Sequence, residues 1–276
     1  MAAGFIASAP CLILNSKPRL CPRGMTLMYD HFASLHAPGT PLVLFNAWDA
    51  GSALAIERSG AKAIATSSWA VAAALGFEDG ESLPLDWLER ITRRIAKSIS
   101  VPLTVDIETG YSEDPAEVAD HALRIRNTGA VGINIEDRDR KTASPVPLAK
   151  HVLKLRAISS AQTSEGEPLF INARSEVFFD PEDPSHPTER MGHAVERAHA
   201  YVDAGADGIF FPGLKDPDLV ARLVEEIGAP INVMVPDVEQ LKIMKQAGAR
   251  RISFGPAPYL SAMEMLTNCS REALTL

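Results

Sequence analysis

Short apolar runs alternate with longer amphipathic segments along most of the chain. The runs are rich in β-branched residues and span 42–45, 63–66, 103–107, 131–135, 169–173, 208–211, 231–235 and 251–254. Between and after them apolar residues recur at three- and four-residue spacing, which predicts helices over 50–59, 84–99, 114–128, 147–163, 187–204, 216–227, 237–248 and 258–267. Strands that alternate with helices of this length predict a parallel sheet, and eight such units are enough to close it into a (β/α)8 TIM barrel.

An internal repeat supports this count. Four tripeptides with a central glycine, at 59–61, 128–130, 204–206 and 247–249, each end a predicted helix and precede every second strand. Glycine suits a helix C-cap because it adopts the left-handed conformation without a Cβ clash. A barrel built from a duplicated unit would show this recurrence. A doubly wound open sheet is also compatible with it, so the repeat favours the barrel without proving it.

Composition narrows the class of protein. The length of 276 residues suits one barrel domain, and the 46% of hydrophobic residues can fill a large core. The net charge of −8 argues against a nucleic-acid partner, and no apolar run is long enough to span a bilayer. The partners expected are therefore small molecules. The cysteines Cys11, Cys21 and Cys269 form no metal-binding pattern, so we expect a reducing cytoplasmic location and no catalytic cysteine.

Residues 1–24 differ in composition from the rest. An apolar stretch is interrupted by Pro10, and positive charges follow it, which is the reverse of the order in a secretory signal. An organelle-targeting peptide is one alternative. We interpret the segment as a disordered or mis-assigned extension, with Met25 or Met28 as the initiator, and expect a single barrel domain over 25–276.

Charged side chains follow three consecutive predicted strands. Asp106 and Glu108 lie two residues apart at the end of the third run, so strand alternation predicts that they share a face. Glu136 follows the fourth run and Arg174 the fifth. Barrel enzymes build their active sites at these strand ends. Three acids converging there predict a hard cation such as Mg²⁺, with Mn²⁺ as a possible substitute, and a nearby guanidinium suits a small anionic substrate.

Structural alternatives exist for the same residues. The acids are also suited to capping helices or to pairing with Arg138, Arg140 or Arg174. Asn172 shares a face with Arg174 by alternation, so both are expected to point into the barrel mouth. No dinucleotide, P-loop or HExxH motif is present that would indicate another chemistry.

Taken together, the strand-end segments carry a family resemblance. The segments 46–53 (NAWDAGSA), 65–68 (ATSS), 106–111 (DIETGY), 132–137 (GINIED) and 172–174 (NAR) resemble, in order, those of the isocitrate lyase/phosphoenolpyruvate mutase superfamily. The resemblance extends over nearly the whole predicted barrel. It implies a (β/α)8 barrel whose last helix is exchanged between the subunits of a homodimer or homotetramer.

The resemblance also implies roles for individual residues. Mg²⁺ would be held, directly or through waters, by Asp106, Glu108 and Glu136. Asp79 matches a further acid of the family's metal site, and with Arg174 it is a predicted catalytic residue. The predicted substrate-binding residues are Ser67, Ser68, Arg174, Asn172 and Asn46.

Two departures bear on the reaction. The lyase branch carries a catalytic cysteine in the loop after the fourth strand, whereas residues 137–145 contain neither cysteine nor histidine. The same lyases have a glutamate after the sixth strand, where this chain has Gly213. Cleavage of isocitrate or 2-methylisocitrate is therefore not expected. The cations Arg138, Arg140 and Lys141 of that loop suit binding an anion better than moving a proton.

The function predicted from the sequence is a Mg²⁺-dependent lyase that acts on a C–C bond of a small 2-oxo acid or dicarboxylate through a metal-stabilised enolate. One alternative is a phosphoenolpyruvate phosphonomutase or phosphonopyruvate hydrolase, which would act on a P–C bond. A second alternative is a catalytically silent barrel that binds 2-oxo acids.

Overall fold

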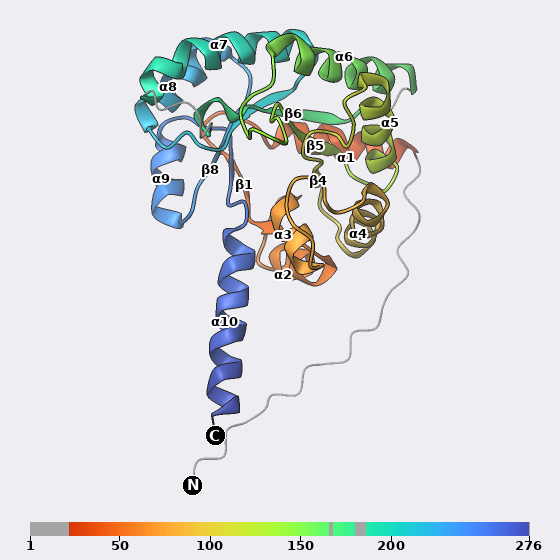
Figure 1. The fold of residues 1–276 in the computed structure, drawn as a ribbon, viewed down its shortest axis with the longest axis vertical. Coiled ribbons are helices and arrows are strands. Elements are labelled where there is room, and N and C mark those ends of the chain that lie inside the picture. The colour runs from red at the N-terminus through yellow and green to blue at the C-terminus, as the bar shows by residue number, and fades with distance from the viewer. Residues whose placement is uncertain (1–21, 166–167, 180–185, 276) are drawn as a thin grey trace.

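The computed structural model describes residues 22–165, 168–179 and 186–275, in which a ring of parallel strands is surrounded by helices (Figure 1). The strands are β1 (Leu42–Leu44), β2 (Asn46–Ala47), β3 (Ile64–Thr66), β4 (Leu103–Asp106), β5 (Gly132–Glu136), β6 (Phe170–Arg174), β7 (Gly208–Phe211), β8 (Ile231–Met234) and β9 (Arg251–Ser253). They lie in the order β1-β9-β8-β7-β6-β5-β4-β3-β2. Strands β1 and β2 are the two ends of this order. Only Phe45 separates them in the chain, so the order returns to its starting point and forms a ring. The predicted (β/α)8 TIM barrel is confirmed.

All eight predicted helices are present. The helices are α1 (Pro22–Ser34), α2 (Ala50–Arg58), α3 (Ser68–Ala74), α4 (Leu85–Ser98), α5 (Pro115–Arg126), α6 (Leu148–Glu165), α7 (Pro187–Asp203), α8 (Pro217–Ile227), α9 (Val238–Gln246) and α10 (Ala257–Leu274), with a 3₁₀ turn η1 (Glu176–Phe178). The sequence reading missed α1 and α3. Helix α1 begins at Pro22, inside the predicted extension 1–24, and residues 1–21 lie outside the described part of the chain.

Helix α1 packs against the floor of the barrel, at the amino-terminal ends of the strands. Its residue Phe32 is fully buried and meets the ring of Phe170 edge to face, with 5.3 Å between ring centroids. His36 stacks on Phe170 at 4.4 Å. Gly132 of β5 leaves room for this packing, since a Cβ there would lie 3.1 Å from Phe32. The active-site end of the barrel is therefore the opposite one.

Aspartates at the ends of loops fix where the helices begin. Asp114, Asp216 and Asp237 each accept a 2.9 Å hydrogen bond from a backbone N–H in the first turn of α5, α8 and α9. Such caps satisfy N–H groups that have no partner inside the helix. Among the residues described, no helix combines the length and apolarity that crossing a bilayer requires.

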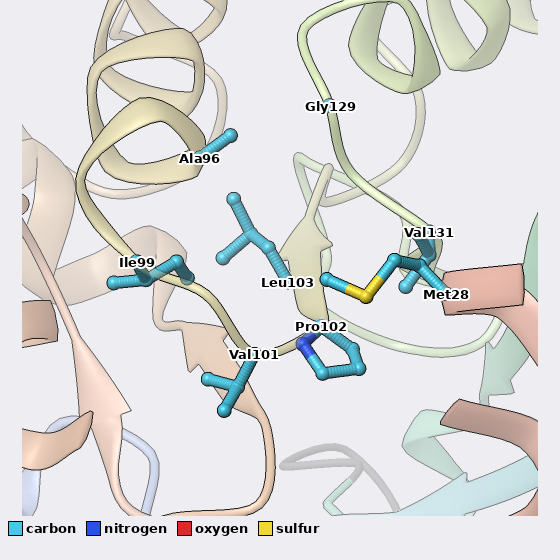
Figure 2. A pocket seen from close by; sticks show the side chains of 8 residues that line it. All are labelled: Met28, Ala96, Ile99, Val101, Pro102, Leu103, Gly129 and Val131. Atoms are coloured by element: carbon cyan, nitrogen blue, oxygen red, sulfur yellow. The ribbon is translucent and has the colours of Figure 1, made fainter. Parts of the chain in front are cut away.

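One small pocket lies outside the strand ring, near the floor (Figure 2). Met28 of α1, Leu103 at the start of β4 and Val131 before β5 contribute to its apolar lining. The lining contains no charged side chain, and the pocket lies at the end of the strands that is remote from Asp106. We therefore look for the functional site at the other end.

The glycines of the repeat provide a test of the fold. Gly60, Gly129, Gly205 and Gly248 all have positive φ, from +90° to +110°, as the C-cap reading predicted. We expect Gly205→Ala to destabilise the protein by about 1–3 kcal/mol more than Gly60→Ala. Both substitutions strain the backbone, but a Cβ at Gly205 would lie 2.6 Å from Ser159 Cβ, whereas nothing lies within 4 Å at Gly60. Urea unfolding of both variants measures the difference, and equal losses would contradict this packing.

A second prediction concerns pH and the barrel floor. Burial raises the pKa of Asp207 to about 6, although Ile171 N–H and the Tyr29 hydroxyl donate to its carboxylate. The native state then binds this proton more tightly than the unfolded chain does. We expect the unfolding free energy of the wild type, relative to Asp207→Asn, to fall by on the order of 2 kcal/mol between about pH 4 and pH 6. Urea unfolding of both proteins from pH 4 to 7 tests this, and a pH-independent difference would contradict it.

Candidate active site

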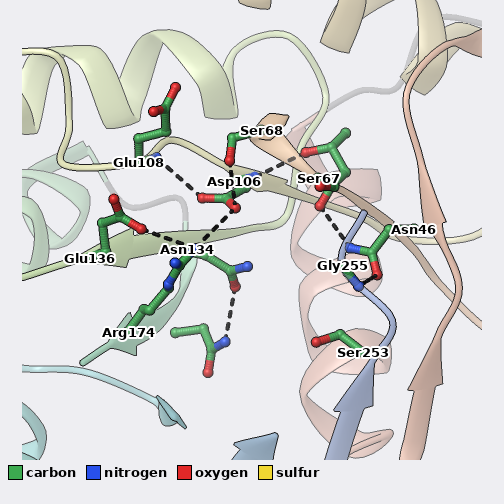
Figure 3. Close-up of polar contacts among 12 residues, drawn as sticks. Asn46, Ser67, Ser68, Asp106, Glu108, Asn134, Glu136, Arg174, Ser253 and Gly255 are labelled. Carbon is green, nitrogen blue, oxygen red and sulfur yellow. Dashed lines mark hydrogen bonds and ion pairs between the residues drawn. The ribbon is translucent and has the colours of Figure 1, made fainter. Parts of the chain in front are cut away.

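Three predicted residues meet at the carboxyl ends of neighbouring strands (Figure 3). Asp106 ends β4, Glu136 ends β5 and Arg174 ends β6. Arg174 Nη1 lies 2.9 Å from Glu136 Oε2 and 3.8 Å from Asp106 Oδ2. Asp106 and Glu136 are buried and Arg174 is largely so, which strengthens these ion pairs relative to pairs in water. Parallel strands thus bring two acids and one guanidinium to a single point.

Hydrogen bonds from three directions fix Asp106. Ser68 Oγ, in the first turn of α3, donates to Asp106 Oδ2 at 3.1 Å. The Glu108 N–H donates to Asp106 Oδ1 at 3.2 Å, and the Asp106 N–H donates to Thr66 Oγ1 at 3.0 Å. The carboxylate is therefore oriented before any ligand arrives.

Glu108 reaches the mouth by a different route from the one that strand alternation predicts. Strand β4 ends at Asp106, and Glu108 has a φ of +52°, a left-handed conformation that is strained for this residue type. Its carbonyl accepts the Glu136 N–H at 2.8 Å, and its carboxylate accepts the Glu81 N–H at 2.7 Å. The expectation of a shared strand face is wrong, yet the two side chains still belong to one acidic cluster.

Glu81, which the sequence analysis did not identify, joins three loops. Its Oε1 accepts the Thr109 N–H at 3.0 Å, the Thr109 hydroxyl at 2.6 Å and the Tyr111 N–H at 2.8 Å. Its Oε2 pairs with Arg140 at 2.7 Å. Arg140 is thus engaged by a carboxylate, contrary to the expectation that it is available for an anion, whereas Lys141 is exposed. The loop after β5 is tied to the mouth through Glu81.

Glu176, a second acid that the sequence analysis did not identify, holds the Arg174 side chain in place. Glu176, in η1, is fully buried and pairs with Arg174 Nε. Asp137 holds this arm in place by accepting the Glu176 N–H at 2.9 Å, the Tyr201 hydroxyl at 2.6 Å and Arg197 Nη1 at 3.0 Å. The sequence signal for Glu176 was its two-residue spacing from Arg174, which continues the alternation past the strand.

The mouth carries an excess of negative charge. Burial, together with the neighbouring carboxylates of Asp79 and Asp106, raises the pKa of Glu108 to about 8. Burial also raises the pKa of Glu136, against the opposing effect of Arg174. The pKa of Asp79 is raised by burial and by Asp106. Asp106, Glu136 and Glu176 lie against the Arg174 guanidinium, and Glu108 and Asp79 add further negative charge beside Asp106. A bound cation would offset this charge.

This donor set fits a hydrated divalent cation. Among the described residues, no group of three or more His, Cys, Asp or Glu side chains is arranged to enclose a metal ion directly. Mg²⁺ usually keeps several waters and binds proteins through one or two carboxylates. Asp106, Glu108, Glu136 and Asp79 supply oxygen ligands and unbalanced negative charge, so they fit Mg²⁺ held in that way.

Two predicted substrate-binding residues make hydrogen bonds between strands. Asn46 Nδ2 donates to Thr66 O at 2.9 Å, and its Oδ1 accepts the Gly255 N–H at 2.9 Å, which joins β2 to β3 and to the end of β9. Asn172 is only 1% exposed and donates to Asn134 Oδ1 at 2.9 Å inside the barrel. Both side chains thus join neighbouring strands, and their contact with a substrate stays a prediction.

The remaining predicted residues lie around the mouth. Ser67 caps α3 by accepting the Ala70 N–H at 3.4 Å, and Ser68 faces Asp106 as described above. Asp79 lies in the loop that follows α3, where much of the residue is accessible although its carboxyl group is partly desolvated. It is close enough to Asp106, Arg174 and Arg138 for their charges to affect its pKa.

Comparison with known proteins places this geometry in a family. The family model for phosphoenolpyruvate phosphomutase matches residues 32–274. A putative phosphonomutase from Burkholderia cenocepacia is 39% identical with a TM-score of 0.87, over 91% of this chain and all of that one. The 2-methylisocitrate lyase of Salmonella typhimurium is 28% identical over 263 residues, or 88% of this chain and 85% of that protein. A phosphonopyruvate hydrolase solved with oxalate and Mg²⁺ shares the fold, with a TM-score of 0.75 and 21% identity over 87% of this chain and 84% of that one. The chain therefore belongs to the phosphoenolpyruvate phosphomutase family, within the isocitrate lyase/phosphoenolpyruvate mutase superfamily.

Proposed function

We propose that the protein is a Mg²⁺-dependent lyase that acts on a C–C bond next to the 2-oxo-acid group of a small dicarboxylate. The observation that carries this proposal is the convergence of Asp106, Glu136 and Arg174 at one barrel mouth. Buried acids beside the Arg174 guanidinium suit a divalent cation and an anionic substrate together. The names of the relatives, which include a lyase and a hydrolase, agree with this class of chemistry.

Each residue of the mouth has a proposed task. Asp106, Glu108 and Glu136 hold Mg²⁺ directly or through waters, with Asp79 as a further acid. Mg²⁺ bound there supplies positive charge beside the oxygen on which negative charge develops. Arg174 is fixed by Glu136 and Glu176 and presents a rigid cation to a substrate carboxylate. Ser68 orients Asp106, and Ser67 lies beside it at the start of α3.

The surroundings favour a reaction that needs no acid on the loop after β5. That loop carries arginines and a lysine, and no cysteine or histidine. At Gly213, a Cβ would lie 2.9 Å from the Phe179 ring and closer still to the Phe178 backbone, so a glutamate does not fit there without moving η1. Decarboxylation or hydrolysis of an oxaloacetate-like substrate suits such a site better than cleavage of isocitrate.

A second candidate is chemistry at a P–C bond. It is favoured by the name of the matching family and by the 39% identity to a putative phosphonomutase. The same Mg²⁺ and the same clamp at Arg174 would serve a phosphonate in place of a carboxylate.

Turnover of oxaloacetate, phosphonopyruvate, phosphoenolpyruvate and 2-methylisocitrate, with Mg²⁺ and with EDTA, tests the proposal. We expect Mg²⁺-dependent turnover of oxaloacetate, lowered at least about 100-fold in Asp106→Asn because a charged ligand of the cation is lost. Asp86→Asn is the matched control, since Asp86 is exposed on α4 and its substitution leaves the mouth intact.

Turnover of the phosphonates alone would replace the proposal with the second candidate. Binding of Mg²⁺ and oxalate without any turnover would indicate a binding barrel. Thermal unfolding that is identical with Mg²⁺ and with EDTA, together with no turnover, would contradict both enzyme functions.

We also propose that α10 packs on a second copy of the chain, as the family resemblance implies. Figure 1 shows α10 projecting away from its own barrel, and Met265 and Leu266 on it are 68% and 61% exposed. On the strand ring, Val43 and Phe45 are 38% and 45% exposed. Exposed apolar surfaces of this kind are typical of protein–protein interfaces.

The measurement is the molar mass in solution, by light scattering after size exclusion. We expect a dimer or tetramer for the wild type. The double variant Met265→Lys, Leu266→Lys should be monomeric, because two charges in place of these exposed apolar side chains oppose their burial against a second copy. Thr267→Lys, Asn268→Lys is the control with the same added charge on polar positions. A monomeric wild type, or equal masses for all three proteins, would refute the exchange of α10.

A further inference from the structure

A buried arginine lies inside the barrel, and no carboxylate among the described residues forms an ion pair with it. Arg251 opens β9, and the whole residue is 1% exposed. Its Nη2 donates to Asn134 Oδ1 at 2.8 Å. Within the described part of the chain its Nε and Nη1 have no hydrogen-bond partner, and the guanidinium carbon lies 5.8 Å from the centroid of the Phe32 ring. Fully buried arginines are rare unless they are paired with an acid.

This side chain belongs to a polar layer beneath the mouth. Asn172 Nδ2 bridges Asn134 Oδ1 at 2.9 Å and Asn232 Oδ1 at 3.1 Å, and Asn232 Nδ2 donates to the Arg251 carbonyl at 3.3 Å. Strand register places Asn134 of β5 directly beside Asp106 of β4. The guanidinium is therefore one hydrogen bond and one strand away from the acidic cluster.

The arrangement disfavours a purely structural role. A buried cation without an ion-pair partner loses its hydration and destabilises the fold, whereas an apolar residue of similar size would fill the space without that loss. Burial lowers the pKa of Arg251 to about 9, and Asp106 opposes this effect, so the two charges act on each other across the layer. At neutral pH the guanidinium remains charged.

We propose that Arg251 is a positioning residue that acts through its charge: from inside the barrel it offsets the negative charge of the mouth. It thereby weakens the hold on a divalent cation and strengthens the hold on an anionic substrate. The inference rests on the proposed function, since it takes the mouth to be a Mg²⁺ and anion site. Arg174 touches the acids directly, whereas Arg251 reaches them only through the field inside the barrel.

The size of the effect follows from distance and charge. Strand spacing puts the guanidinium on the order of 10 Å from the mouth. At an effective dielectric constant of about 20, one unit charge at that distance changes the binding constant of a singly charged ligand by about tenfold. Loss of Arg251 favours the binding of both Mg²⁺ and protons to the acids. Because Mg²⁺ carries two charges and a proton carries one, the effect on Mg²⁺ is larger, and Mg²⁺ binding tightens even where the acids are partly protonated.

The test is calorimetric titration with Mg²⁺, and with oxalate at saturating Mg²⁺, for the wild type, Arg251→Met, Arg251→Gln and Arg251→Lys. We expect both neutral variants to bind Mg²⁺ at least about tenfold more tightly and oxalate at least about tenfold more weakly, because each ligand carries two charges, while Arg251→Lys stays near the wild type. Asn232→Ala is the control, because it disrupts the same layer without changing its charge, and neither affinity should shift.

Several results would overturn the inference. Unchanged affinities in the neutral variants would show that the charge does not reach the mouth, and would leave the proposed function intact. Equal changes in Arg251→Lys or Asn232→Ala would assign the effect to packing. Neutral variants that fail to fold would show that the charge serves the fold. A wild type that binds no Mg²⁺ would overturn the proposed function first, and this inference with it.

Discussion

Like charges that are held close together and away from water repel one another, and the mouth of this barrel contains several of them. Arg174 is the interaction that makes the cluster possible. It pairs with Glu136 on one side and Glu176 on the other, and lies within 4 Å of Asp106. Removing a single partner from such a buried set leaves an uncompensated charge. The geometry of the candidate site therefore depends on one side chain at the end of β6.

The strand ends were predictable because parallel strands share an edge. Once alternation identified the runs, Asp106, Glu136 and Arg174 had to lie together, whatever the details of the loops. Glu81 was not predictable in this way, since its role depends on loop conformations that no periodicity encodes. The positive φ of Glu108 has the same origin: it lies beyond the strand, where alternation no longer applies.

The depth of a side chain within the barrel was the other property that could not be predicted from the sequence. Alternation shows which side chains point inward, but it does not separate the mouth from the layers below it. Asn172 was therefore assigned to the substrate, although it belongs to the polar layer that includes Asn134 and Arg251. Helix α3 was missed for a related reason, because its alanine-rich sequence has no amphipathic stripe: three of its residues are buried. Tertiary packing, and not local pattern, decides such segments.

The contacts of Asn46 determine when this ring can close. Its carboxamide oxygen accepts the N–H groups of Phe254 and Gly255, more than 200 residues further along the chain. During synthesis strand β1 therefore keeps an unpaired edge until β9 has been made. Contacts of such sequence separation slow folding, and open strand edges are where growing chains associate wrongly. The open edge of β1 is therefore the part of the growing barrel that is most exposed to wrong pairing until β9 is made.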